Sequence, residues 1–149
     1  STYKYGTASD QLTKYCNNSS YGKDGFTDNK TELDSEDDAA TVNWGGKWRM
    51  PTKEEQDELL NECKWEWITQ YGVKGYKVIG KNGNSIFLSV SGFMCNDSLC
   101  YADSCGGYWS SSLCSDSVAS SYGMGFTSDG MNWNANYFAF GNPVRPVCK

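Results

Sequence analysis

The apolar periodicity of this chain changes at Cys63, and this change limits the possible folds more than any other feature. Up to Cys63 the pattern is helical: Thr52 and Glu55 form a T-x-x-E capping box, and Leu59 and Leu60 recur with Cys63 on one face. Beyond Cys63 the period falls to two, which is typical of strands. Helical segments followed by strands predict an α+β domain.

A second, shorter helix is expected over residues 33–44. Ser35 is its candidate N-cap, with Asp38 three residues on, and the acidic first turn suits the helix dipole. The charge run here lacks the spacing of an EF-hand, so we interpret it as a solvated helix start rather than a calcium site.

Period-two segments and turn dipeptides predict the strands. The length of 149 residues, with no internal repeat and no linker-like stretch, indicates one domain over residues 1–149. The predicted strands are residues 75–80 and 85–90 around Asn82-Gly83, residues 108–112, the hairpin at residues 122–134 over Asp129-Gly130, and an edge or short strand at residues 142–149.

Large aromatic rings carry much of the apolar content. Aromatic residues make up 15% of the chain, while hydrophobic content is 38% and the mean hydropathy is −0.63. We therefore expect a loop-rich domain whose core is built on Trp, Tyr and Phe. The net charge of −5 argues against a nucleic-acid partner, because phosphates are bound by clustered Lys and Arg. No apolar run approaches the ~18 residues of a membrane span, so no direct membrane insertion is expected.

The residues needed for common catalytic and metal chemistry are missing. The chain contains no histidine, so neither a Ser-His nor a Cys-His pair can form, and no glycine-rich phosphate loop is present. Acidic residues concentrate at residues 24–66, on the predicted helix surface. The C-x4-C-x4-C spacing at residues 95–105 is not the C-x-x-C pairing of zinc sites. We expect no enzymatic activity, no metal and no other cofactor.

Residues 106–143 contain no Lys, Arg, Glu or Gln and consist largely of Gly, Ser, Asn, Tyr, Phe and Trp. This composition is typical of binding loops, in which Tyr and Trp supply rigid contact area and Ser, Gly and Asn supply adaptable hydrogen bonds. Turns rich in Gly, Ser and Asn around a β-core would give the same composition without any ligand. Composition alone leaves the two interpretations open.

Several stretches taken together resemble a known family. They are "WRMPT" at residues 48–52, "GVKGYKVIGKNGNSIFL" at residues 72–88, "YWSSS" at residues 108–112 and "VRPVC" at residues 144–148. Residues 30–149 resemble the C-type-lectin-like variable proteins of diversity-generating retroelements, in the branch related to the formylglycine-generating enzyme fold. Similar domains occur in Bacteroides-type gut bacteria and phages and are known as Fibrobacter-type paralogous domains.

The resemblance implies a C-type-lectin-like α+β fold with two helices, a small twisted antiparallel sheet and long loops. Ligands would bind on the sheet and its loops. Family members continue upstream with a strand segment that "STYKYG" lacks, so this chain is expected to be the C-terminal portion of a longer protein.

In such systems a reverse transcriptase replaces AAY codons for Asn by NNY codons, which cannot encode Lys, Glu, Gln, Met or Trp. Residues 106–147 are the candidate variable region, in which Met124, Met131 and Trp133 would be fixed scaffold. The ligand-binding positions that the resemblance implies are Cys114, Asp116, Val118, Ala119, Gly123, Gly125, Thr127, Asn132, Asn134, Ala135, Asn136, Tyr137, Phe138 and Phe140.

Strand alternation adds an expectation about faces. Met124 and Phe126 should point to the core, and Gly123, Gly125 and Thr127 should point outward. Tyr108 and Ser110 alternate with Trp109, a scaffold candidate, so they should border the ligand site.

The resemblance also implies a disulfide, because related folds tie the helix to the last strand. Cys63 and Cys148 match those places. Cys95 is left with two alternative partners, Cys100 and Cys105. Cys114 would be a variable position with a free thiol.

The leading hypothesis is a non-enzymatic domain of receptor or adhesin type that displays a diversified surface to an unknown protein or surface glycan. Tyr137, Phe138 and Phe140 would anchor the partner and should be solvent-accessible in the free protein. The expected location is extracellular, on a bacterial surface or on a phage particle. The alternatives are a structural or adhesin module of a bacterial surface lipoprotein, and a calcium-dependent lectin. The lectin hypothesis is weakened because the calcium-dependent sugar-binding motifs of animal lectins, E-P-N and W-N-D, are absent from the sequence.

Overall fold

The structure is mostly β, which corrects the predicted fold class. A computed structural model describes residues 4–5, 11–95, 97–138 and 140–148. Strands hold 43% of the residues and helices 14%, and a C-type-lectin α+β fold is not found. Within the described residues the strands form four small antiparallel sheets.

The elements follow the chain with short connections. They are η1 (a 3-10 turn, Lys23–Gly25), α1 (Ala39–Trp44), β1 (Trp48–Arg49), α2 (Lys53–Glu62), β2 (Lys64–Gln70), β3 (Val73–Ile79), β4 (Ser85–Ser89), β5 (Phe93–Cys95), β6 (Ser98–Cys100), β7 (Cys105–Leu113), β8 (Ser120–Thr127), β9 (Gly130–Tyr137), β10 (Phe140–Gly141) and β11 (Val147–Cys148). Within the described residues the four sheets have the strand orders β2-β3-β4, β7-β8-β9, β10-β5-β6 and β1-β11.

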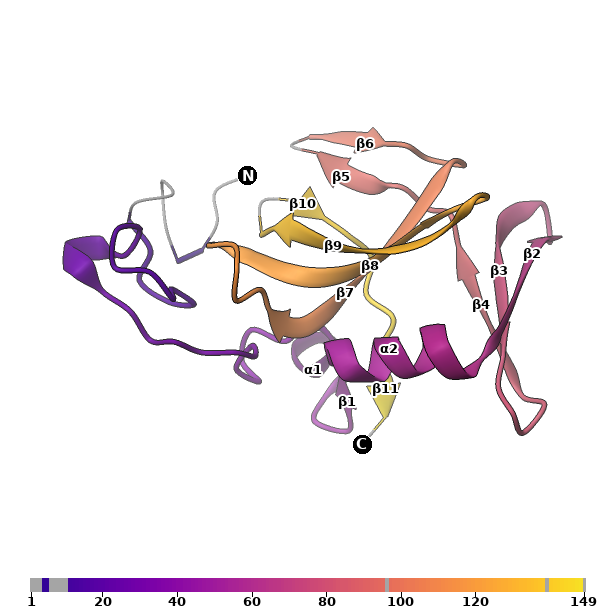
Figure 1. The fold of residues 1–149 in the computed structure, drawn as a ribbon, viewed down its shortest axis with the longest axis horizontal. Helices are drawn as coiled ribbons and strands as arrows, with labels where there is room; N and C mark the ends of the chain where they lie inside the picture. Colours follow the sequence, from indigo (N-terminus) through magenta and orange to yellow (C-terminus); the bar gives the residue numbers. More distant parts are fainter. Residues whose placement is uncertain (1–3, 6–10, 96, 139, 149) are drawn as a thin grey trace.

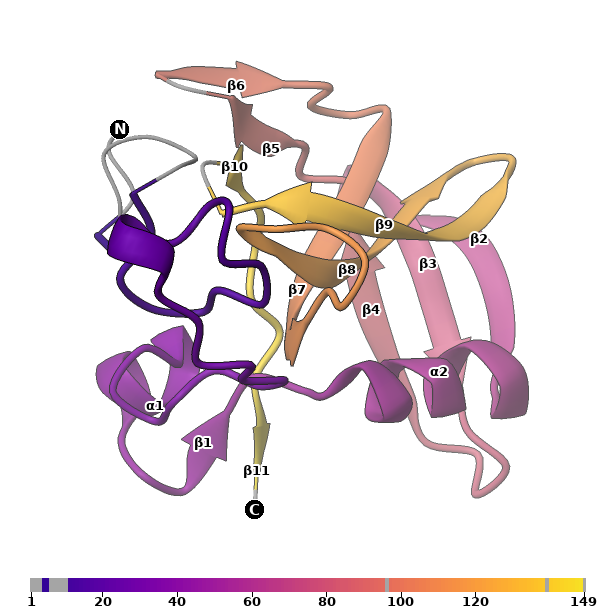
Figure 2. The ribbon, with the colours of Figure 1, turned by 60° about the vertical axis from the view of Figure 1, so that its left-hand side comes forward.

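Figure 1 shows the β7–β9 sheet crossing the centre, the β2–β4 sheet at the right and α2 running beneath them, with the N-terminal segment at the left. In Figure 2 the β10-β5-β6 sheet lies on the opposite side of β9 from α2. None of the helices in the described ranges is long and apolar enough to cross a membrane.

Local signals placed α2 and two hairpins correctly. Thr52 caps α2, with a reciprocal capping box that includes Glu55. β3 and β4 are joined by the turn at residues 80–84, and β8 and β9 pair from Thr127↔Gly130 onward, next to the predicted turn. These features were predictable because each depends on a few neighbouring residues.

The first helix is shorter than predicted, and β2 was not predicted. α1 covers only Ala39–Trp44, because the side chain of Asp38, not Ser35, accepts hydrogen bonds from the amides of Ala40 and Thr41. β2 turns Lys64–Gln70 into a strand paired along its whole length with β3. The shorter helix and the additional strand shift the molecule from α+β towards β.

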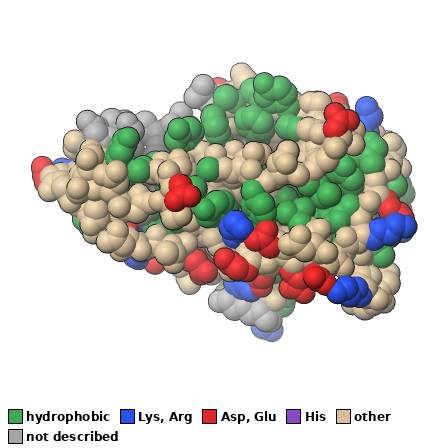
Figure 3. Space-filling model, in the orientation of Figure 1, with side chains coloured by type: hydrophobic (Ala, Val, Ile, Leu, Met, Phe, Trp, Pro, Cys, Tyr) green, Lys and Arg blue, Asp and Glu red, His purple; other side chains and the backbone are tan. Residues whose placement is uncertain are grey.

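The core lies between the β7–β9 and β2–β4 sheets. Tyr108, Met124 and Phe126 from one sheet meet Tyr76 and Leu88 from the other, and all five are buried. This confirms that Met124 and Phe126 point inward. Half-buried Trp65, Trp67, Met131 and Trp133 pack around this cluster. In the orientation of Figure 1, the surface view of Figure 3 shows hydrophobic side chains around the two main sheets. A belt of acidic and basic groups lies below them, where α2 runs.

A serine-rich irregularity joins β7 to the rest of the fold. The β7–β8 register shifts between Trp109 and Leu113, so three consecutive serines leave the regular ladder. Ser110 is fully buried and its hydroxyl donates to the carbonyl of Tyr122 at 2.8 Å. The Ser111 amide donates to Pro51 at 2.8 Å, which docks the start of α2. Buried hydroxyls here satisfy backbone groups that the bulge frees.

Lys14 holds the acidic loop before α1. Its ammonium nitrogen lies 2.7 Å from Asp34, 2.8 Å from Glu36 and 2.6 Å from Asp37. These carboxylates are grouped closely enough for a cation, and the lysine ammonium supplies the positive charge among them. The Tyr15 hydroxyl donates to Asp37 at 2.7 Å, and burial together with this bond raises the pKa of Tyr15 to about 12.

We expect the Lys14 cluster to make the free energy of unfolding depend on pH, with stability lost in acid. Burial opposes the charge of Asp37, but hydrogen bonds from Lys14, Tyr15 and Tyr5 outweigh it and hold the pKa of Asp37 well below its usual value. A lowered folded-state pKa stabilises the fold above the unfolded value of ~3.9 and loses that contribution as pH falls below it. Asp37→Asn should lower the free energy of unfolding by ~2 kcal/mol at pH 7.

Urea unfolding from pH 7 to pH 2 measures this effect. The difference between Asp37→Asn and the unmodified protein should shrink as pH falls from about 5 to about 2. A constant difference over that range would contradict the assignment. Asp97→Asn, at an exposed position without an ion pair in the described structure, is the control.

Candidate functional site

The candidate site is a small groove on the face of the β7–β9 sheet that points away from α2. Register places Asn132 opposite Gly125, Asn134 opposite Gly123 and Asn136 opposite Ser121, so the three Asn residues form one row along β9. We call this site the amide groove. Its volume is about 150 Å³, and its lining residues are Phe93, Cys105, Gly106, Gly107, Gly125, Phe126, Thr127, Gly130, Asn132, Asn134, Asn136 and Asn142.

Two glycines of β8 let the Asn side chains lie across the sheet. A Cβ added to Gly125 would lie 2.4 Å from Nδ2 of Asn134, and one added to Gly123 would lie 2.8 Å from Nδ2 of Asn136. Real Cβ atoms do not come this close to other heavy atoms, so a side chain there would displace the amides. The amides therefore rest on backbone, where their donors and acceptors are held close to the sheet.

The amides of the groove have unused hydrogen-bonding capacity. The side chains of Asn132, Asn134, Asn136 and Asn142 make no hydrogen bond to another residue in the ranges that the structure describes. The Nδ2 group of Asn142 is buried and has no partner there. Each side-chain amide offers two N–H donors and an acceptor oxygen. Buried donors without a partner are rare and call for an explanation such as a ligand or water.

Among the residues that the structure describes, no charged side chain lines the amide groove. Burial raises the pKa of the Cys105 thiol, which therefore stays protonated near neutral pH. Phe93 adds one half-buried ring and packs against Phe140 with ring centroids 5.8 Å apart. The groove can thus donate and accept hydrogen bonds without ionic attraction, and it offers one apolar surface.

The groove contains five of the predicted ligand-binding residues, and its floor adjoins a sixth. The sixth is Gly123, which is buried beneath Asn136. The five lining residues are Gly125, Thr127, Asn132, Asn134 and Asn136.

Tyr108, Ser110 and Cys114 are not where the sequence placed them. Tyr108 is 7% exposed and belongs to the core, Ser110 is fully buried in the serine bulge, and Cys114 is 6% exposed. Tyr108 pairs with Met124, which points inward, and directly paired residues share a face of a sheet. Trp109, expected as scaffold, lies on the face of the groove through its pairing with Gly123 but is not among the residues that line it.

The other predicted positions lie beside the groove or on other surfaces. Asp116, Val118 and Ala119 lie in the β7–β8 connection, where Asp116 is exposed. Ala135 is exposed on the side of β9 that carries Trp133. The predicted aromatic strip is only partly accessible. Tyr137 is 57% exposed, whereas Phe138 packs on Tyr15 at 6.4 Å and Phe140 packs on Phe93.

Sequence reasoning missed seven of the twelve residues that line the groove: Phe93, Cys105, Gly106, Gly107, Phe126, Gly130 and Asn142. Cys105 and Gly107 lie four and two positions before Trp109 in β7, so all three residues point to the same face of the sheet. Placing Trp109 on the correct face would therefore have identified Cys105 and Gly107. Phe93 and Asn142 come from the β5 and β10 region and carry no local signal. They join the site only because β10 pairs with β5 beside the main sheet.

The cysteine pairing implied by the resemblance is not found. All seven cysteines are free thiols, with Cys63 half-buried beside α2 and Cys148 exposed on β11. Cys95 and Cys100 lie two positions apart across the β5–β6 hairpin, and Cys105 begins β7. Burial, and next the neighbouring Cys95, raise the pKa of Cys100.

Comparison of the chain with models of protein families, with curated proteins and with solved structures finds no match.

Proposed function

We propose that this protein is a non-enzymatic binding domain that uses the amide groove to hold an uncharged polar ligand. The observation that carries the proposal is the row of Asn132, Asn134 and Asn136 on a glycine floor, with no hydrogen-bond partner in the described structure. Hydrogen-bonding groups that are free of protein partners and gathered in one concavity can exchange water for a ligand that bonds to several of them at once.

Neutral glycans are the ligand class that fits the groove best. Sugar hydroxyls donate and accept hydrogen bonds, as side-chain amides do, and the ring carbons of a sugar can pack on Phe93. The absence of charged lining residues removes the attraction on which anionic or cationic ligands depend. A peptide amide or side-chain amide of a partner protein offers the same kind of hydrogen bonding, and it is the second source of ligand.

Diversification of this surface by a retroelement remains a separate part of the proposal. Asn132, Asn134 and Asn136 are outward or half-buried positions at which other NNY-encoded residues fit. Gly123 and Gly125 are poor candidates, because a side chain at either would meet an Asn amide. Sequencing the flanking DNA tests this part: a near-copy of residues 106–147 with AAY codons at these Asn positions is expected, and its absence would remove the diversification.

Titration of ¹⁵N-labelled protein with neutral mono- and disaccharides tests the binding function. The side-chain NH₂ signals of Asn132, Asn134, Asn136 and Asn142 should shift together. The triple variant Asn132→Ala, Asn134→Ala, Asn136→Ala should bind at least tenfold more weakly, because each hydrogen bond contributes ~0.5–1.5 kcal/mol and 1.4 kcal/mol is tenfold in affinity.

Asn61→Ala is the matched control, because Asn61 is an exposed Asn on α2 outside the groove. It should leave affinity unchanged. Undiminished sugar binding by the triple variant would show that the groove is not the site. If no neutral sugar binds but a protein partner does and is lost in the triple variant, the ligand is a protein.

A further inference from the structure

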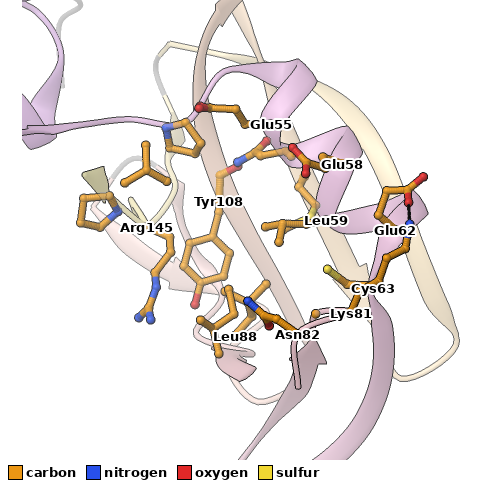
Figure 4. Close-up of a pocket in the computed structure, with 17 residues that line it drawn as sticks. Glu55, Glu58, Leu59, Glu62, Cys63, Lys81, Asn82, Leu88, Tyr108 and Arg145 are labelled. Atoms are coloured by element: carbon orange, nitrogen blue, oxygen red, sulfur yellow. Dashed lines mark hydrogen bonds and ion pairs between the residues drawn. The ribbon is translucent and has the colours of Figure 1, made fainter. Parts of the chain in front are cut away.

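A second and larger cavity lies on the other face of the β7–β9 sheet, between α2 and the β3–β4 hairpin. Its volume is about 650 Å³, within the range of ~300–1,000 Å³ that small-molecule sites occupy. Leu59, Leu88 and Met124 are among the apolar residues that line it. Figure 4 shows Tyr108 in the middle of the cavity, with Leu59 and Cys63 on the side of α2 and Leu88 below. We call it the α2 cavity.

Gln56 lines this cavity, and its side chain carries one acceptor without a partner in the described structure. The residue is 2% exposed. Its Nε2 donates to the carbonyls of Trp109 at 3.2 Å and Tyr108 at 3.4 Å, which fixes the orientation of the amide. Oε1 is then buried without a hydrogen-bond partner in the described structure. A buried polar atom without a partner costs stability, so an occupant that donates to Oε1 is favoured.

The charges at the mouth of the cavity largely cancel. Glu55 is paired with Arg49 at 2.5 Å and Glu62 is paired with Lys81, both within the described structure. Glu58 and Arg145 have no ion pair there, carry opposite charges and lie on opposite sides of Tyr108 in Figure 4. A charged head group therefore gains little at the mouth, and it would lose its hydration deeper in the cavity.

We propose that the α2 cavity binds a small apolar molecule that carries one uncharged hydroxyl, which donates to Oε1 of Gln56. The apolar body lies against Leu59, Leu88 and Met124, where burial of apolar surface supplies most of the affinity. The hydroxyl fixes the orientation of the molecule. The α2 cavity and the amide groove lie on opposite faces of one sheet, so the proposal does not depend on the function assigned to the groove.

A pair of ligands that differ only in the donor tests the proposal on the unmodified protein. 4-Propylphenol carries a phenolic hydroxyl, and 4-propylanisole has the same body with a methyl ether. Titrations followed by methyl NMR should show shifts at Leu59, Ile86, Leu88 and Met124 but not at the remote, buried Leu12. The phenol should bind five- to tenfold more tightly than the ether, as one hydrogen bond implies. Hexanoate should bind more weakly than 1-hexanol.

Several outcomes would overturn the proposal. Equal affinities for the phenol and the ether would mean that Oε1 is satisfied by water, and tighter binding of hexanoate would mean that Arg145 selects an anion. Shifts confined to other residues, or no shift with any of these probes, would show that the cavity is not a ligand site.

Two variants locate the binding. Leu59→Trp fills the cavity and should abolish the shifts at Leu88 and Met124. Gln56→Met replaces the amide by an apolar side chain of similar length that has no Oε1. This variant should therefore lose the preference for the phenol over the ether, while both ligands still bind. If this variant does not fold, the comparison of the two ligands on the unmodified protein still decides the question.

Discussion

Replacing Phe126 by alanine is expected to lower the free energy of unfolding by about 3–5 kcal/mol, the largest effect that we anticipate for one substitution. Phe126 is 3% exposed. Its ring lies 5.7 Å from that of Tyr76, 6.1 Å from that of Tyr108 and 6.4 Å from that of Trp65. These rings come from both main sheets, so Phe126 joins the two halves of the core. Its removal leaves a cavity that rigid neighbouring rings cannot easily close.

Urea unfolding monitored by tryptophan fluorescence measures this loss. Phe26→Ala is the matched control, because Phe26 is 37% exposed in a connecting segment and should cost less than ~1 kcal/mol. Phe126→Leu should fall between the two, because part of the apolar volume remains. A loss for Phe126→Ala no greater than that for Phe26→Ala would mean that the two sheets do not share one core.

Replacing Asp38 by alanine is expected to cost about 2–4 kcal/mol. This carboxylate is 5% exposed and accepts three backbone hydrogen bonds, from Ala40 and Thr41 at 2.9 Å and from Met50 at 2.8 Å. Two of them cap α1, and the third ties the segment after β1 to the same residue. The alanine variant leaves these N–H groups without their acceptor, and hydrogen bonds to charged groups are worth ~1.5–3 kcal/mol.

Thermal and urea unfolding give the size of the loss, and amide hydrogen exchange gives its location. The amides of Ala40 and Met50 should lose protection in Asp38→Ala more than amides of β8 do. Thr52→Ala is the control, because Thr52 caps only α2 and should cost ~1 kcal/mol. A cost for Asp38→Ala below that of Thr52→Ala would show that the bond to Met50 contributes nothing.

Features that depend on neighbouring residues could be predicted from the sequence. The capping box of α2 and the β3–β4 turn depend on residues within four positions of one another. β2 escaped prediction because pairing with β3 along Lys64–Gln70 stabilises it. The N-cap of α1 was assigned to Ser35 rather than Asp38 because both have capping side chains, and the contact with Met50 favours Asp38.

Part of the candidate site could be predicted as well, because that part depends only on neighbouring residues. The row of Asn132, Asn134 and Asn136 is visible as strand alternation, and its uncharged character is visible in composition. The faces of Tyr108 and Ser110 were wrong, because they depend on the register between β7 and β8 and on the bulge after Trp109. In a strand a shift of one residue exchanges the two faces, and no local pattern fixes that register.

The sequence by itself determined the turns, the cap of α2, the aromatic character of the core and a segment without charge that carries alternating amides. Only the tertiary structure decided which face each β7 residue occupies, that Asn142 and Phe93 join the amide groove, and that Oε1 of Gln56 has no partner among the described residues. The physical reason is how far apart in the sequence the interacting residues lie. Capping and turn formation are satisfied by atoms a few residues apart, whereas strand register, cavities and unpaired buried atoms arise when distant segments pack together.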